Sequence, residues 1–182
     1  MISDFVKGKK KFDYPQAIQK GIALHRAIDT FTDNHIATKT AKEFFRPAYR
    51  LYSGAFIDVI YDHFLAIDEN EFTEKSLFDF TQKTYESLDL DKHWMPEYFS
   101  TMFPYMKQHN WLFNYRTRWG LEKSLGGVVR RSAYLTESET AFNLFEQHYQ
   151  LLQDCYRHFW AEVKPFAFEK FEMLLSDGDM TV

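Results

Sequence analysis

Residues 48–67, AYRLYSGAFIDVIYDHFLAI, decide the fold of this 182-residue chain. Pro47 precedes them and suits the first turn of a helix, where a backbone N–H is not needed. At about 100° per residue, the stretch places apolar side chains on nearly every side. A helix that is apolar all round is buried. We therefore expect a central helix over residues 48–67, built on Leu51, Tyr52, Ala55, Phe56, Val59, Ile60, Phe64 and Leu65.

Further helices are expected on both sides of this central one. After Pro15, apolar residues at steps of three and four predict a helix over residues 16–31. Thr73 is expected to cap a helix that ends near Leu88, and residues 87–93 form a polar connection.

The second half of the chain is also expected to be helical. Residues 95–124 predict helices broken near His109 and Gly120, and Gly126 with Gly127 predicts another break. Ser138 is expected to cap a long helix to about Val163, and Pro165 opens or kinks a short last one. No alternating run predicts a strand. The expected fold class is all-α, a single helical domain over residues 1–182.

Composition supports this class and excludes several functions. The chain is 45% hydrophobic and 19% aromatic, with only 7 Gly and 5 Pro, so long helices around an aromatic core are favoured. A single cysteine, Cys155, excludes an internal disulfide and a cysteine-based zinc site. The net charge of −4 disfavours nucleic-acid binding. No membrane segment or signal peptide is visible, so we expect a cytoplasmic protein.

Acids and histidines recur at helical spacing in two of the expected helices. His25 and Asp29 are one turn apart and share a face with isoleucines. Asp58 and Asp62 are also one turn apart, and His63 follows directly. Acids on an apolar face are costly unless they are paired or bind a metal. Carboxylate and imidazole ligands without thiolate suit Mn²⁺ or Mg²⁺, or else Fe.

The same spacing also fits a purely structural role. A single His–Asp pair one turn apart more often makes a buried hydrogen bond than a metal site. Two such pairs on two aromatic-lined helices leave both interpretations open. Spacing identifies neither the substrate nor whether the two pairs converge.

Several runs of sequence are similar to a known family. They are Asp4–Gly8 (DFVKG), Gly21–Asp33 (GIALHRAIDTFTD) and Asp58–Leu65 (DVIYDHFL), with further segments at Asn110–Leu112, Tyr115 and Gly126–Arg131. The chain resembles the acyl-carrier-protein phosphodiesterase family over most of its length. That family usually carries a short histidine-containing segment ahead of the first run. Here Met1 precedes Asp4 by only three residues, so this segment is expected to be missing.

The resemblance implies a metal-dependent phosphodiester hydrolase. Such enzymes remove 4′-phosphopantetheine from the serine of holo-acyl carrier protein and leave apo-carrier, with a divalent cation that is typically Mn²⁺. The family is similar to divergent His-Asp (HD-like) phosphohydrolases, in which an adjacent His-Asp pair contributes to the metal site. In this chain the adjacent pair is reversed, Asp62-His63, so ligand roles do not transfer directly.

We expect the following residues to form the site. The expected catalytic residues and metal ligands are Asp4, His25, Asp29, Asp62 and His63, with Asp58 and Asp33 as second choices. Acyl carrier proteins are acidic, so basic residues are expected to bind the phosphate or the carrier: Lys7, Arg26, Arg130 and Arg131, with Lys9, Lys10, Arg46 and Arg50 as further candidates.

Other functions remain open at this point. One alternative is an HD-like phosphohydrolase acting on a nucleotide or another small phosphoester. Another is a non-catalytic helical carrier-binding module. In a module without metal, the buried acids would pair with arginines, for which the candidates are Arg46, Arg50, Arg116 and Arg118. The sequence does not determine the oligomeric state.

Overall fold

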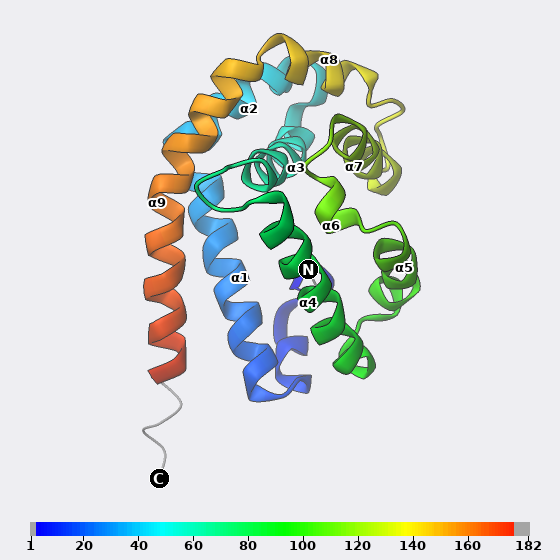
Figure 1. The fold of residues 1–182 in the computed structure, drawn as a ribbon, viewed down its shortest axis with the longest axis vertical. Helices are drawn as coiled ribbons and strands as arrows, with labels where there is room; N and C mark the ends of the chain where they lie inside the picture. The colour runs from blue at the N-terminus through cyan, green and yellow to red at the C-terminus, as the bar shows by residue number, and fades with distance from the viewer. Residues whose placement is uncertain (1–2, 177–182) are drawn as a thin grey trace.

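A computed structural model describes residues 3–176, apart from the side chain of Asp4, and this part of the chain is helical without strands (Figure 1). Four short 3-10 helices are η1 (Ser3–Phe5), η2 (Gly8–Asp13), η3 (Arg50–Tyr52) and η4 (Lys92–Trp94). The α-helices are α1 (Gln16–Asn34), α2 (Ile36–Tyr49), α3 (Ser53–Ala66), α4 (Glu74–Leu90), α5 (Glu97–Gln108), α6 (Trp111–Asn114), α7 (Arg118–Arg131), α8 (Glu139–Gln147) and α9 (Tyr149–Ser176). The expected all-α class is confirmed.

Helix α3 forms the centre of the main core, as its apolar sequence predicts. Phe56, Ile57, Ile60 and Phe64 on this helix are almost fully buried. They belong to a cluster that also takes in side chains of α2, α7, α8 and α9. A smaller cluster of Tyr85, Phe99, Phe103 and Met106 joins α4 to α5.

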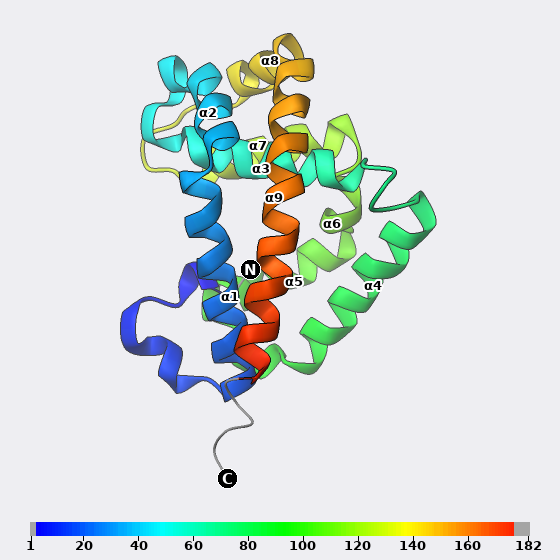
Figure 2. The same ribbon diagram turned by 90° about the vertical axis from the view of Figure 1, so that its left-hand side faces the viewer.

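Helices α1 and α9 lie side by side along the molecule (Figures 1 and 2). Phe31 on α1 stacks on Phe166 of α9 with ring centroids 4.6 Å apart. Glu71, in the loop between α3 and α4, accepts hydrogen bonds from Trp160 Nε1 at 2.8 Å and from Lys164 Nζ at 2.7 Å. Helix α9 is thereby joined to α1 and to the loop that leads into α4.

The expected single helix over residues 48–67 is wrong at its start. Pro47 lies in the last turn of α2, and the chain leaves the helical conformation at Arg50, whose φ is 48°. Helix α3 begins only at Ser53. A proline disrupts the hydrogen bond to the residue four before it, which is tolerated where the helix is about to end.

The expected break at Gly126 and Gly127 is wrong, whereas the expected break near Gly120 is confirmed by the turn between Asn114 and Arg118. Helix α7 runs through Gly120, Gly126 and Gly127 without interruption. A Cβ atom at Gly120 would lie 1.9 Å from the carbonyl oxygen of Asn114. This glycine therefore permits close contact between α7 and the end of α6, whereas the expected break near His109 is confirmed as the end of α5.

Helix ends elsewhere agree with the sequence only in part. Thr73 caps α4 in a capping box with Ser76, as expected. Ser138 precedes α8 without a side-chain capping bond, and Glu137 accepts from the Thr140 N–H at 2.9 Å instead. The expected helix over residues 138–163 is two helices, because the chain bends at His148. Helix α9 then continues through Pro165 to Ser176.

Candidate functional site

Two aspartates, Asp58 and Asp62, lie one turn apart on the solvent-accessible side of α3. Although the Asp62 side chain is exposed, protein atoms packed around its carboxyl group displace water and raise its pKa to about 7. The negative charge of Asp58 contributes to this rise. A cation bound at this face would relieve the repulsion between the two carboxylates.

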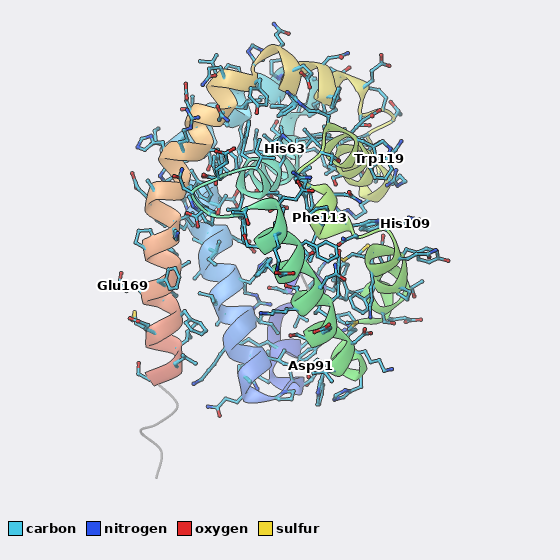
Figure 3. The ribbon with its side chains drawn as sticks, in the orientation of Figure 1. His63, Asp91, His109, Phe113, Trp119 and Glu169 are labelled. Atoms are coloured by element: carbon cyan, nitrogen blue, oxygen red, sulfur yellow. The ribbon has the colours of Figure 1, made fainter. Side chains whose placement is uncertain are left out.

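His63, about 100° from Asp62 around α3, is buried where this helix meets α7 (Figure 3). Only 2% of its surface is exposed, and burial lowers its pKa, which favours the neutral imidazole. Its Nδ1 lies 2.6 Å from the carbonyl oxygen of Tyr115, so Nδ1 donates and Nε2 carries the lone pair. Within the described part of the chain, Nε2 has no hydrogen-bond partner.

Tyr115 follows α6 and lies beside the reversed pair. Its backbone carbonyl accepts from His63 Nδ1 at 2.6 Å, and its hydroxyl acts to lower the pKa of Asp62. Burial and the charge of Asp62 raise the pKa of the Tyr115 hydroxyl, which therefore stays protonated at neutral pH. Ser124 and Arg131, both on α7, also act on this hydroxyl.

On α1, His25 and Asp29 form the expected pair. His25 Nδ1 lies 2.9 Å from Asp29 Oδ2, and 55% of the Asp29 side chain is exposed. Because the Asp29 carboxylate is exposed and paired with His25, no cost of burial has to be offset by a metal ion. Asp33, one turn further, forms an ion pair with Lys42 of α2 at 2.7 Å.

The first family run is held against α1 by Arg26. Arg26 Nη2 donates to the carbonyl oxygen of Val6 at 2.5 Å, and Val6 itself is buried. Asp4 lies in η1, but its side chain is outside the described residues. Lys7 is exposed ahead of η2. In this structure Arg26 thus positions the run that carries Asp4.

The two arginines at the end of α7 differ in their surroundings. The Arg130 guanidinium lies over Gly126 and Gly127 of its own helix, where the absence of side chains leaves room for it. The charge of Arg131 acts on the Tyr115 hydroxyl and lowers the pKa of that group.

The described side chains do not bring the predicted ligands together at one point. No three histidine, cysteine, aspartate or glutamate side chains there converge closely enough to hold a metal ion. The donor types nevertheless suit a divalent cation, because two carboxylates repel each other on α3 and the buried His63 Nε2 has a free lone pair. The fit therefore rests on donor chemistry, and Asp4 is the predicted ligand whose side chain is not described.

Three of the four arginines that were candidates to neutralise the acids bind other groups. Arg46 pairs with Glu43, Arg116 with Glu74 and Arg118 with Glu146. Arg118 also lies over the rings of Phe145 and Tyr149. These contacts weaken the interpretation in which arginines balance the acids of a metal-free binding module.

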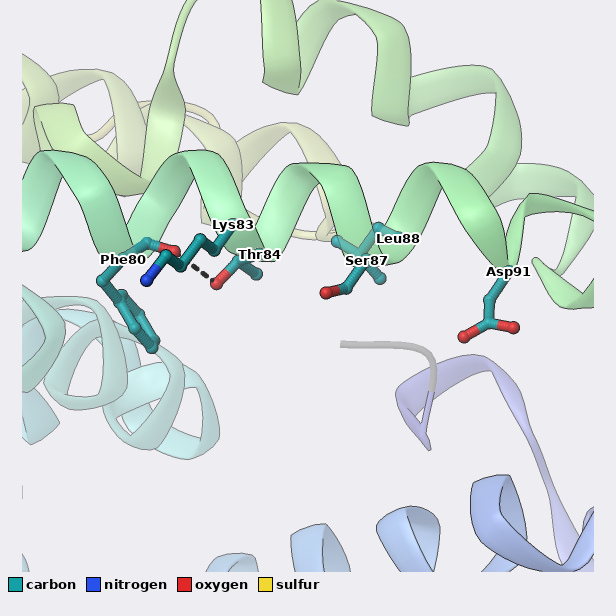
Figure 4. Close-up of a pocket in the computed structure, with 6 residues that line it drawn as sticks. All are labelled: Phe80, Lys83, Thr84, Ser87, Leu88 and Asp91. Atoms are coloured by element: carbon teal, nitrogen blue, oxygen red, sulfur yellow. Dashed lines mark hydrogen bonds between the residues drawn. The ribbon is translucent and has the colours of Figure 1, made fainter.

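A hollow of about 320 Å³ lies along one side of α4 (Figure 4). Phe80 and Leu88 provide apolar surface, Lys83 and Asp91 provide opposite charges, and Thr84 and Ser87 complete the lining. It contains no pair of groups suited to acid–base catalysis. The hollow therefore offers binding surface next to α4 and no reacting centre of its own.

Comparison with known proteins assigns these features to a family. The family model described as acyl carrier protein phosphodiesterase matches residues 1–163, which include every predicted site residue. The chain belongs to the acyl carrier protein phosphodiesterase family. It is therefore similar to a family of enzymes, and the resemblance in its sequence runs is confirmed.

Individual relatives carry the same name. An acyl carrier protein phosphodiesterase of Yersinia pestis is 31% identical over 88% of this chain and 83% of its own length. One of Photorhabdus laumondii is 29% identical over 94% of this chain and 85% of its own length. No solved structure matches, so the expected likeness to HD-like phosphohydrolases stays a prediction.

Sequence reasoning did not identify Tyr115 as part of the site. Its only signal was its place among the family segments, next to the Asn110–Leu112 run. Its hydrogen bond joins it to His63, 52 positions earlier, and no local periodicity indicates a contact at such a separation.

None of the helices within residues 3–176 is long and apolar enough to cross a membrane.

Proposed function

We propose that this chain hydrolyses the phosphodiester that links 4′-phosphopantetheine to the serine of holo-acyl carrier protein, leaving apo-carrier. The family match over residues 1–163 carries the proposal, because it covers both helices with the expected ligands. The unusual electrostatics of Asp62 support it, since a strongly raised carboxyl pKa beside a second acid is typical of functional sites. The expected setting is the cytoplasm.

A divalent cation, with Mn²⁺ expected, is part of this proposal. Its ligands would come from Asp58, Asp62, His63, His25, Asp29 and Asp4. Bound there, the cation supplies an activated water and neutralises charge on the phosphate. The Asp62 carboxylate must be deprotonated to bind a cation, and a bound cation favours that form. Arg131, whose charge acts on Tyr115, is the guanidinium we assign to contact a phosphate oxygen.

The test is to incubate the chain with holo-acyl carrier protein and weigh the carrier by mass spectrometry. We expect loss of the phosphopantetheine mass with Mn²⁺ and no loss with EDTA. Asp62→Ala and Asp29→Ala should each lower the rate by at least about tenfold if these residues are ligands or position them.

Other outcomes separate this proposal from its alternatives. Cleavage of nucleotides or small phosphoesters with no change in the holo-carrier would favour a general phosphohydrolase. Binding of the carrier without any loss of mass, at all Mn²⁺ concentrations, would favour a carrier-binding module. Cleavage that persists in EDTA would contradict the metal dependence and leave the substrate assignment intact.

A further inference from the structure

Helix α7 presents one side to the core and the opposite side to solvent. The residues that it contributes to the main core share one side of the helix: Leu121, Leu125 and Val128. At about 100° per residue, a second set lies within an arc of about 60° on the opposite side: Trp119, Lys123, Gly126 and Arg130. The three side chains of this second set are exposed, and we call the set the outer face of α7.

The charge of α7 differs in sign from that of the whole chain. The helix carries four cations and one acid, whereas the chain has a net charge of −4. Arg118 is neutralised by Glu146. Within residues 3–176, by contrast, neither Lys123 nor Arg130 forms an ion pair or a hydrogen bond. The acid of this helix, Glu122, lies at the edge of the outer face, which therefore presents two cations without counter-charges of their own.

Two consecutive glycines leave the middle of the outer face without side chains. Glycine is disfavoured relative to alanine inside a helix. Backbone contact does not require it here: the atom nearest to a Cβ at Gly126 would be Arg130 Nη1, at 3.3 Å, and at Gly127 it would be Arg130 Nη2, at 3.7 Å. The glycines thus let the guanidinium lie against the helix surface, with its N–H donors free for an acceptor on another molecule.

Trp119 adds apolar surface at the start of the same face (Figure 3). Its side chain is 55% exposed, and its indole N–H has no hydrogen-bond partner in the described part of the chain. Tryptophan and arginine are enriched among the residues that contribute most to protein–protein binding. A tryptophan, two cations without counter-charges and a patch without side chains together suit a protein surface that carries carboxylates.

We propose that the outer face of α7 docks the acidic carrier protein, with Lys123 and Arg130 binding its carboxylates and Trp119 packing beside them. This inference rests on the proposed function, in which holo-acyl carrier protein is the substrate. Charge complementarity selects this partner. In a symmetric dimer of this chain, the same patch would meet itself and bring cation against cation.

Binding of apo-carrier tests the docking face without any cleavage, because apo-carrier has the same protein surface and no phosphodiester to hydrolyse. Isothermal titration calorimetry measures its Kd. We expect Lys123→Gln and Arg130→Gln each to raise Kd by about fivefold, and Trp119→Ala by about tenfold or more. The same ratios should appear in kcat/KM for holo-carrier.

Lys92→Gln is the matched control for charge. Lys92 is exposed in η4 and has no ion pair within residues 3–176, so this variant makes the same change in net charge on a different element. We expect its Kd to stay within about twofold of the wild-type value. Equal weakening in Lys92→Gln and Lys123→Gln would show that only the net charge matters, and this result would overturn the inference.

Gly126→Ala separates docking from loss of folding. Because alanine is favoured over glycine in a helix, this variant should have a raised melting temperature. Its methyl group displaces the Arg130 guanidinium, so we expect Kd for apo-carrier to rise by about threefold. A raised melting temperature with unchanged Kd would overturn the role assigned to the glycines.

The remaining outcomes distinguish this inference from the proposed function. Cleavage of holo-carrier with wild-type kcat/KM and Kd in every α7 variant would overturn the docking face and leave the function standing. Carrier binding that depends on Trp119 and Arg130, without any cleavage, would support the docking face and contradict the hydrolysis. A wild-type chain that neither binds apo-carrier nor cleaves holo-carrier would overturn both.

Discussion

Asp62 is the residue whose energetics the fold changes most clearly. Its pKa of about 7 in the folded chain lies above the ordinary aspartate value of 3.8. Between these values the folded state binds more protons than the unfolded state. This group therefore favours folding below about pH 4, and its contribution is lost as the pH rises to 7.

Asp62→Asn should stabilise the metal-free chain at pH 8, because it removes an unfavourable charge and the repulsion from Asp58. The full pKa difference corresponds to about 4 kcal/mol. Since the side chain is exposed to solvent, we expect about 1 kcal/mol, or about 2–4 °C in Tm for a chain of this size. Thermal unfolding in EDTA at several pH values measures this, and the gain should disappear near pH 4.

Two comparisons make this prediction specific. Glu122→Gln removes one negative charge from an exposed position on α7 and should leave Tm nearly unchanged. Adding Mn²⁺ should raise the Tm of the wild-type chain and have little effect on Asp62→Asn. A destabilised Asp62→Asn chain at pH 8 would show that the carboxylate is already balanced by protein groups.

At the scale of helices, the decisive contact is between the end of α6 and the start of α7. Gly120→Ala would place a Cβ atom 1.9 Å from the Asn114 carbonyl oxygen, so backbone must move. We expect a loss of at least about 1–3 kcal/mol in stability. The displaced turn carries Tyr115, so cleavage of holo-carrier should fall as well. Urea unfolding and the mass-spectrometric assay measure the two effects.

Gly21→Ala is the matched control for that substitution. Gly21 lies in α1, is exposed, and a Cβ atom there would meet nothing within 4 Å. Alanine is favoured over glycine in a helix, so we expect a gain of about 0.5–1 kcal/mol. Equal losses in both variants would mean that the α6–α7 contact does not set the requirement for glycine.

Helix ends show where local signals were sufficient and where they were not. Thr73 was predictable as a cap because its partner Ser76 is three residues away. The places of Pro47 and Pro165 within their helices were not predictable. A proline is compatible with a helix start, a last turn or an exposed interior position. Packing of α2 on α3 and of α9 on α1 decides between these possibilities.

For the whole molecule, the proposed activity requires an acidic carrier to approach a chain with a net charge of −4. Because this net charge would repel an acidic partner, we expect exposed cations such as Lys7 and Arg130 to provide local attraction. Raising the salt concentration from about 0.05 to 0.5 M should lower kcat/KM for holo-carrier by about tenfold and leave kcat unchanged. A small phosphodiester substrate, which needs no steering, is the control. An unchanged kcat/KM for the carrier would refute docking by these cations.

The sequence alone determined the helical class, the buried central helix and the family. These properties follow from local periodicity and from contiguous runs such as Gly21–Asp33 and Asp58–Leu65. It also determined that Asp58 and Asp62 share one face, since residues four apart in a helix always do.

Only the tertiary structure decided which face of α3 is buried and what meets it. His63 is buried against the carbonyl of Tyr115, whereas the neighbouring Asp62 is exposed. The contacts of Tyr115 depend on two segments 52 residues apart coming together. Helical spacing fixes angles between neighbours, whereas contacts between distant segments depend on how all the helices pack.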